Sequence, residues 1–175
     1  SVDMATATAS PPAWLSHAHP EMLPIDFDGV QRSFGGRQAY CSASPVYRKK
    51  AAALVEKLAE RYAKHPAVVM WHVNNEYGCH NPHCYCDVSR AAFIDYLKTR
   101  YASLDELNAS WGTDFWSQRY YNWEEMQVPK RTTDGTHPNP GCQLDFRRFS
   151  SDNILELYKM ERDIIKKYDQ VNPVT

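Results

Sequence analysis

The hydrophobic pattern has its sharpest feature between residues 65 and 78, where an apolar run turns polar at its C-terminal end. Residues 68–73 read Val-Val-Met-Trp-His-Val, which is too short for a helix and lacks the alternation of a strand with one wet face. The pattern predicts a parallel strand that is covered on both faces. Such a strand delivers Asn75, Glu76 and Gly78 to the edge where parallel α/β folds hold their functional groups.

A helical pattern precedes this strand. Ser44 and Pro45 have the form of an N-cap and a first helical residue, and apolar side chains recur at helical spacing from there to Tyr62. The helix leads almost directly into the strand, so the sequence contains one strand–helix–strand unit. We expect it to form a right-handed crossover.

Three further helices are predicted. One begins at Ser89 as its cap and has apolar side chains on one face as far as Tyr101. A capping box at residues 103–106 starts a short helix that Gly112 ends. A long amphipathic helix covers residues 144–168. The overall pattern therefore predicts an α/β fold.

The remaining segments read as strands and long connections. Val2 to Thr8 reads as a short strand, and the terminal Pro173-Val174-Thr175 reads as the start of another. Residues 20–44 form a long connection without periodic pattern, and Arg37 stands near its end. Long connections in compact domains are often functional.

Composition excludes several classes of protein. The net charge is −1 and hydrophobic residues make up 43% of the chain, which is typical of a globular protein. This balance gives no indication of a nucleic-acid partner or an anionic membrane. No apolar run approaches the roughly 20 residues of a membrane span, and the start lacks the order of a signal peptide. We therefore expect a soluble, cytoplasmic protein.

Glu76 is the first candidate for catalysis because of its place at the strand end. A glutamate after a strand is more often a neighbour of a helix cap or a partner in a salt bridge. The position alone therefore leaves both interpretations open.

Cysteines and histidines are dense just after this point. Residues 79–86 contain three thiols and two imidazoles, whose density indicates a metal site. The Cys84-Tyr85-Cys86 spacing, however, is less specific than that of common zinc sites. The favoured interpretation is that reduced thiols pack as small hydrophobic groups.

Four blocks of sequence resemble glycoside hydrolase family 42, the β-galactosidases, and they occur in the order that the family has. The blocks are Arg37-Gln38-Ala39-Tyr40-Cys41-Ser42-Ala43-Ser44-Pro45, residues 71–78, Cys84-Tyr85-Cys86, and Phe115-Trp116-Ser117-Gln118.

This resemblance implies a partial (β/α)8 TIM barrel of a clan A glycoside hydrolase. It also implies a retaining β-galactosidase that hydrolyses terminal non-reducing β-D-galactose from β-galactosides. Glu76 would be the general acid/base, Asn75 would bind the sugar 2-hydroxyl, Arg37 would contact galactose, and Trp116 would form a wall of the site. The implied partner is a β-galactoside substrate, no cofactor is implied, and the assembly would be a homotrimer.

The resemblance also bears on metal binding. Some members of the family hold a structural zinc through four cysteines, at the positions of Cys41, Cys84, Cys86 and Ser89. A hydroxyl is a poor zinc ligand compared with a thiolate. Cys79 or His83 could substitute for it, but the ligand count favours the interpretation that no metal is bound here.

Length indicates that the barrel is incomplete. A whole (β/α)8 barrel takes about 250 residues, and the 175 residues here contain far fewer than eight strand–helix units. We expect residues 1–175 to be part of the catalytic barrel domain, truncated at both ends.

A retaining glycosidase also needs a second carboxylate as nucleophile. No other acidic residue lies at the end of a buried strand, so we expect the nucleophile beyond Thr175 and expect these residues alone to be inactive. The acidic residues that fail this test are Asp114, Glu124, Glu125 and Asp145. Two alternatives stay open: another retaining clan A glycosidase, or a non-catalytic metal or binding module built on the Cys/His cluster.

Overall fold

The computed structural model describes residues 2–3 and 9–175. Of the strand expected over residues 2–8, only Val2 and Asp3 lie within the described residues, where they form a strand. The elements in chain order are β1 (Val2–Asp3), α2 (Ala13–Ala18), η1 (Pro20–Met22), α3 (Pro45–Tyr62), β2 (Trp71–His72), α4 (Asp87–Arg100), α5 (Leu104–Trp111), η2 (Trp123–Glu125) and α6 (Pro140–Tyr168).

A small parallel sheet forms one layer. β1 pairs with β2 in parallel, with Val2 opposite Trp71, and Trp71 forms a second parallel bridge with Val174. The Thr175 amide donates to the carbonyl of Trp71 at 2.9 Å. The terminal segment therefore does start a further parallel strand, as the sequence predicts.

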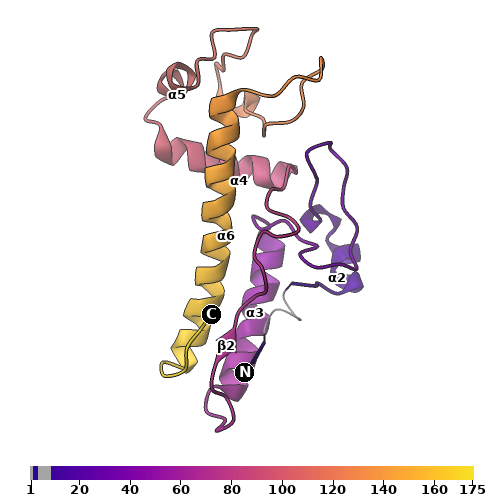
Figure 1. Cartoon of the computed structure of the whole chain (residues 1–175), viewed down its shortest axis with the longest axis vertical. Helices are drawn as coiled ribbons and strands as arrows, with labels where there is room; N and C mark the ends of the chain where they lie inside the picture. The colour runs from indigo at the N-terminus through magenta and orange to yellow at the C-terminus, as the bar shows by residue number, and fades with distance from the viewer. Residues whose placement is uncertain (1, 4–8) are drawn as a thin grey trace.

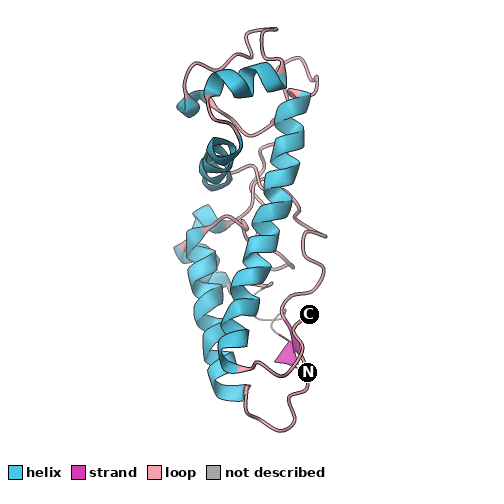
Figure 2. Cartoon of the chain, turned by 90° about the vertical axis from the view of Figure 1, so that its left-hand side faces the viewer, coloured by secondary structure: helices cyan, strands magenta, loops and turns pink. Residues whose placement is uncertain are grey.

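Two helices form the layer behind this sheet. α3 and α6 pack side by side along much of their length (Figures 1 and 2). Trp71 and Val73 pack with Val55 and Ala59 of α3 and Ile165 of α6 in one buried cluster. Helices packed on a parallel sheet are the arrangement of an α/β fold.

The prediction that residues 68–73 are a strand covered on both faces was wrong in extent. The ladder includes only Trp71 and His72, and Val69 is 64% exposed. Successive side chains of a strand point to opposite faces. Trp71 and Val73 are fully buried toward the helices, whereas His72 between them is only half-buried.

Local capping explains where the helices begin and end. The Ser44 hydroxyl accepts from the Tyr47 amide at the start of α3, and Ser103 accepts from the Glu106 amide at the start of α5. Gly112 ends α5 in the left-handed conformation, with φ +63°. These predictions are confirmed. The cap predicted at Ser89 was wrong, because the N-cap of α4 is Cys86, whose sulfur accepts from the Ser89 amide.

The second half of the chain forms a helical lobe around the N-terminal part of α6. We define the α4–α5 lobe as residues 87–128 together with residues 140–149; in Figure 1 it lies at the end of α6 opposite the sheet. Its core contains aromatic and aliphatic side chains from all three helices. They are Phe93, Leu97, Leu107, Trp111, Met126, Val128, Cys142, Phe146 and Phe149.

Candidate active site

The polar end of β2 leaves the core within a few residues. Val73 and Asn74 are buried, whereas Asn75 and Glu76 are exposed. Glu76 has φ +53° and Gly78 has φ +76°, and the Cys79 amide donates to the Glu76 carbonyl at 3.0 Å. The strand therefore ends in a tight turn that presents Glu76 at its start. For a residue other than glycine this left-handed conformation is uncommon, and such residues cluster at functional sites.

Arg37 lies beside the Glu76 carboxylate. Its Nη1 donates to Glu76 Oε2 at 3.1 Å, and both side chains are about half exposed. The residues are distant in sequence, so the long connection after η1 must fold back over the end of β2. The two predicted site residues are thus brought together by tertiary structure.

Gln38 is a site residue that the sequence analysis missed. It is buried and has φ +60°, and its side chain donates to the Glu76 carbonyl at 2.7 Å. Its amide oxygen accepts from the His80 amide at 3.4 Å. Gln38 therefore fixes both ends of the Glu76 turn. Its place beside Arg37 in a block that resembles the family was the one available signal.

Asn75 is exposed next to Glu76. Its neighbour Asn74 is buried and donates to the Tyr40 hydroxyl at 3.4 Å. The two amides of the Asn-Asn-Glu sequence therefore have different roles. Asn74 contacts the protein interior, and Asn75 faces outward.

Trp116 is not brought to Glu76. Gln118, two residues after it, accepts from Asn139 at the start of α6, whereas Gly78 lies against Ile154 in the middle of α6. At about 1.5 Å per residue, these two points on α6 are roughly 22 Å apart along its axis. Trp116 is 72% exposed and stacks on Phe115 with ring centroids 4.6 Å apart.

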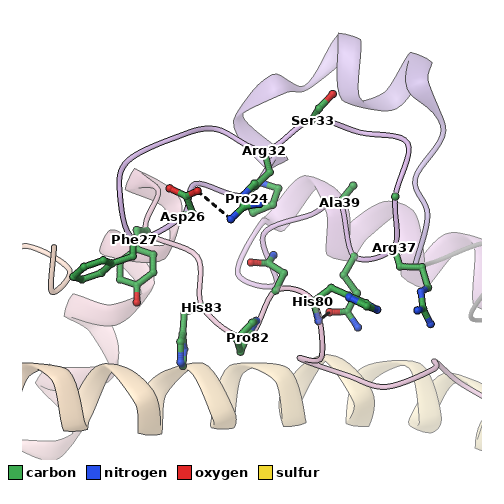
Figure 3. A pocket seen from close by; sticks show the side chains of 14 residues that line it. Pro24, Asp26, Phe27, Arg32, Ser33, Arg37, Ala39, His80, Pro82 and His83 are labelled. Atoms are coloured by element: carbon green, nitrogen blue, oxygen red, sulfur yellow. Dashed lines mark hydrogen bonds and ion pairs between the residues drawn. The ribbon is translucent and has the colours of Figure 1, made fainter. Parts of the chain in front are cut away.

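A cavity of about 630 Å³ opens beside the Arg37–Glu76 pair (Figure 3). The connection after η1 forms one wall, and residues 80–85 form the other. Arg37 and His80 lie at one end of the cavity and Phe27 lies at the other, and Gln38 and Tyr85 also line it. This volume is in the range of small-molecule sites.

The other acidic residues are engaged elsewhere. Asp114 pairs with Arg119 at 3.1 Å, and Glu125 accepts from the Tyr121 amide at 2.8 Å. Asp145 is buried in the α4–α5 lobe. None of them shares a contact with Glu76 in the described part of the chain, so these residues do not supply a paired carboxylate.

Three buried thiols form a cluster that is separate from the Glu76 turn. The sulfur atoms of Cys41, Cys84 and Cys86 lie within 4.8 Å of one another, and all three residues are buried. Ser89 Oγ lies 3.2 Å from the sulfur of Cys41. Hydrogen bonds from Cys41 and Cys84 lower the pKa of Cys86, and the same contacts raise the pKa of Cys41.

This thiol cluster does not complete a structural zinc site. Such a site is closed by four protein ligands, and the fourth neighbour here is the hydroxyl of Ser89. The donor set is therefore one thiolate short, and the absence of a bound metal stays a prediction.

The described residues give one finding on membranes. No helix in ranges 2–3 and 9–175 combines the length and apolar character that are needed to cross a bilayer.

Comparison with known proteins identifies the family of this chain. The family model of glycoside hydrolase family 42, described as Beta-galactosidase, matches residues 1–175. A curated relative, Beta-galactosidase LacZ of Heyndrickxia coagulans, is 56% identical over 98% of this chain and 26% of that protein. Beta-galactosidase bgaB of Geobacillus kaustophilus is 45% identical over 99% of this chain.

Solved structures agree with the fold. The β-galactosidase from Bacillus circulans sp. alkalophilus superposes with a TM-score of 0.88 at 46% identity, over 97% of this chain and 25% of that one. The enzyme from Halorubrum lacusprofundi gives a TM-score of 0.92 at 39% identity. The chain spans about a quarter of the length of these relatives. The chain therefore belongs to glycoside hydrolase family 42, and its fold is part of a clan A (β/α)8 barrel.

Proposed function

We propose that residues 1–175 are part of the catalytic barrel of a retaining β-galactosidase, and that the barrel continues on both sides of them. The proposed reaction releases terminal non-reducing β-D-galactose from β-galactosides. The observation that carries this proposal is the Glu76 carboxylate, held 3.1 Å from Arg37 at the C-terminal end of a parallel strand. In parallel barrels, catalytic groups stand at this end of the strands.

The proposed chemistry uses Glu76 twice. Its carboxylic acid first donates a proton to the glycosidic oxygen while a second carboxylate attacks the anomeric carbon. A glycosyl ester forms and the aglycone leaves as an alcohol. Glu76, now a carboxylate, then takes a proton from the water that hydrolyses this ester, so the enzyme returns to its starting state. Asn75 would hold the 2-hydroxyl of the galactose during both steps.

The exposure of Glu76 leaves room for a second carboxylate beside it. Its side chain is 55% exposed and pairs with Arg37. The two carboxyl groups of a retaining glycosidase stand about 5 to 5.5 Å apart. No other acidic residue in the described part of the chain contacts Glu76, so we infer that the nucleophile lies outside these residues.

Arg37 and Trp116 would bind different parts of the substrate. The Arg37 guanidinium pairs with Glu76 through Nη1 and borders the cavity, so it can hold a galactose hydroxyl at the same time. Trp116 presents an exposed indole on which a sugar ring can stack. Its distance from Glu76 along α6 supports a contact with a more remote part of the substrate rather than with the galactose beside Glu76.

Exchange of Glu76→Gln in the full barrel protein tests this assignment. We expect hydrolysis of a galactoside with a poor leaving group to fall by about a hundredfold to ten-thousandfold, because proton donation is lost. Formation of the glycosyl ester from a dinitrophenyl galactoside needs little acid and should fall much less. Glu124→Gln, which alters an exposed carboxylate on η2, is the matched control.

Two results would contradict the proposal. Full activity of Glu76→Gln on the poor leaving group would remove Glu76 from the chemistry. Hydrolysis of an aryl galactoside at an enzymatic rate by residues 1–175 alone would show that no outside nucleophile is needed.

Assays of the full barrel protein and its Glu76→Gln variant also distinguish this function from related ones. A panel of nitrophenyl glycosides distinguishes galactose from the glucose, mannose or arabinose units that other retaining clan A enzymes would prefer. A non-catalytic metal or binding module predicts that Glu76→Gln has no effect on any of them. The trimeric assembly and the cytoplasmic location stay predictions.

A further inference from the structure

The turn that presents Glu76 also gathers two classical metal ligands beside it. One carboxylate oxygen of Glu76, the sulfur of Cys79 and a ring nitrogen of His80 all lie within 4.8 Å of one another. All three side chains are exposed. All five cysteines of the chain lie in its described part, and Cys79 is the exposed one among them. This group is therefore distinct from the buried cluster of Cys41, Cys84 and Cys86.

Backbone hydrogen bonds hold this arrangement together. The Cys79 amide donates to the Glu76 carbonyl at 3.0 Å, which closes the turn. The buried side chain of Gln38 bonds the Glu76 carbonyl and the His80 amide. The three ligand-bearing residues thus share one anchor, and a ligand would meet a preformed turn.

The donor set fits a thiophilic divalent cation. Zinc binds thiolate, imidazole and carboxylate at about 2.0 to 2.3 Å in a tetrahedron, so these ligand atoms stand about 3.3 to 3.6 Å apart. The three atoms here lie within 4.8 Å of one another and need to close by at most about 1.5 Å to reach that spacing. Three protein ligands would leave a fourth position for water.

Arg37 opposes binding without preventing it. It pairs with Oε2 of Glu76, and within ranges 2–3 and 9–175 no hydrogen bond reaches Oε1. A cation held through Oε1 would still feel the positive charge of the guanidinium, which weakens the site. Binding should therefore be reversible by a chelator.

We propose that Glu76, Cys79 and His80 form a binding site for Zn²⁺ and similar thiophilic divalent cations, and that occupancy blocks the acid/base carboxylate. The inhibitory part rests on the proposed function, because it needs Glu76 to transfer a proton. A metal-bound carboxylate cannot carry that proton, so the bound state is inactive. The binding part stands on the geometry alone.

Binding is tested by titrating the full barrel protein with Co²⁺, whose thiolate charge-transfer band reports a sulfur ligand. We expect the wild type to bind one equivalent more than Cys79→Ala, and His80→Ala to bind that equivalent at least about tenfold more weakly. Equal stoichiometry and equal spectra in the wild type and Cys79→Ala would overturn the proposed site. His17→Ala, an exposed histidine on α2, is the matched control. This readout does not depend on any glycosidase activity.

Inhibition is tested by galactoside hydrolysis with increasing Zn²⁺. Without metal, Cys79→Ala should hydrolyse substrate at the wild-type rate, since Cys79 is exposed and has no proposed part in the reaction. We expect its inhibition constant for Zn²⁺ to rise at least about tenfold and expect EDTA to restore the wild type. Identical inhibition of both proteins would overturn the inhibitory role. If the protein hydrolyses no glycoside, the proposed function fails while the Co²⁺ titration still decides the site.

Discussion

Helix α6 carries two buried carboxylates, Asp145 in the α4–α5 lobe and Glu161 near the sheet, and their surroundings are opposite. Asp145 accepts from the Tyr101 hydroxyl at 2.6 Å and from the Trp111 indole at 3.0 Å, and it pairs with Arg148 at 3.0 Å. Glu161 is fully buried, and neither of its oxygens has a hydrogen-bond partner among the described residues.

These surroundings determine whether each carboxyl group is ionised. Burial alone would raise the pKa of Asp145, but the hydrogen bonds from Tyr101, Trp111 and Arg148 outweigh burial and lower it. Burial without such bonds raises the pKa of Glu161 to about 8. At neutral pH Asp145 is therefore an anion in a network, and Glu161 is mainly a neutral acid.

The buried polar groups of the α4–α5 lobe are hydrogen-bonded, whereas several of those near the sheet have no partner in the described part of the chain. The polar groups around Asp145 are matched within the α4–α5 lobe. Near the sheet, Asn74 Oδ1 and the Tyr77 hydroxyl are also buried without partners among the described residues. An unmatched buried polar group costs about 1 to 3 kcal/mol. Among the described residues, the region that supports the Glu76 turn therefore carries more of this cost than the α4–α5 lobe.

The largest effect is expected at Asp145. Exchange to Ala removes the acceptor for the Tyr101 hydroxyl and the Trp111 indole and the carboxylate that pairs with Arg148, so the free energy of unfolding should fall by about 4 kcal/mol. Urea unfolding followed by tryptophan fluorescence measures this. Asp163→Asn, on the exposed face of the same helix, should change stability by less than about 0.5 kcal/mol. If the two variants are equally stable, the network around Asp145 contributes no stability.

The second prediction concerns the pH dependence that Glu161 imposes. Its folded pKa lies above the unfolded value of 4.5, so the folded state binds more protons between those two pKa values. Below the unfolded pKa, Glu161 is protonated in both states and does not lower the free energy of unfolding. As pH rises toward its folded pKa of about 8, the free energy of unfolding falls progressively. Across that window the loss should be on the order of 4 kcal/mol.

Glu161→Gln isolates this contribution, because its amide does not titrate. The difference between the variant and wild-type stability curves should grow as pH rises. Glu156→Gln, an exposed glutamate of α6 paired with Lys159, is the matched control and should give a constant difference. Parallel curves for the wild type and Glu161→Gln would mean that Glu161 is ionised and paired in the folded protein.

Local signals made part of this molecule predictable. Ser44, Ser103 and Gly112 fix helix ends through bonds that span a few residues, and the structure confirms them. The polar end of the strand followed from the hydrophobic pattern, and the resemblance singled out Arg37 and Glu76, but their pairing at 3.1 Å was found only in the structure.

The features that the sequence did not predict depend on tertiary packing. The bond of Gln38 to the Glu76 carbonyl depends on a loop that folds back from a distant segment, and no local pattern marks it. The exposure of Val69 depends on which strands pair beside β2. Trp116 lies in an aromatic segment whose position is set by a bond of Gln118 to Asn139.

The smallest predicted effect tests whether the Asp145 network works as a sum of separate bonds. Tyr101→Phe removes one hydroxyl that donates to Asp145 at 2.6 Å and keeps the ring, which packs edge-on against Trp111. A single hydrogen bond to a charged group contributes about 1.5 kcal/mol, and Asp145 keeps its other donors. Urea unfolding should therefore show a loss of about 1 kcal/mol. Combining Tyr101→Phe with Asp145→Ala should add almost nothing, since the partner is already gone. A full additive loss in the double variant would show that Tyr101 stabilises the lobe through contacts other than this carboxylate.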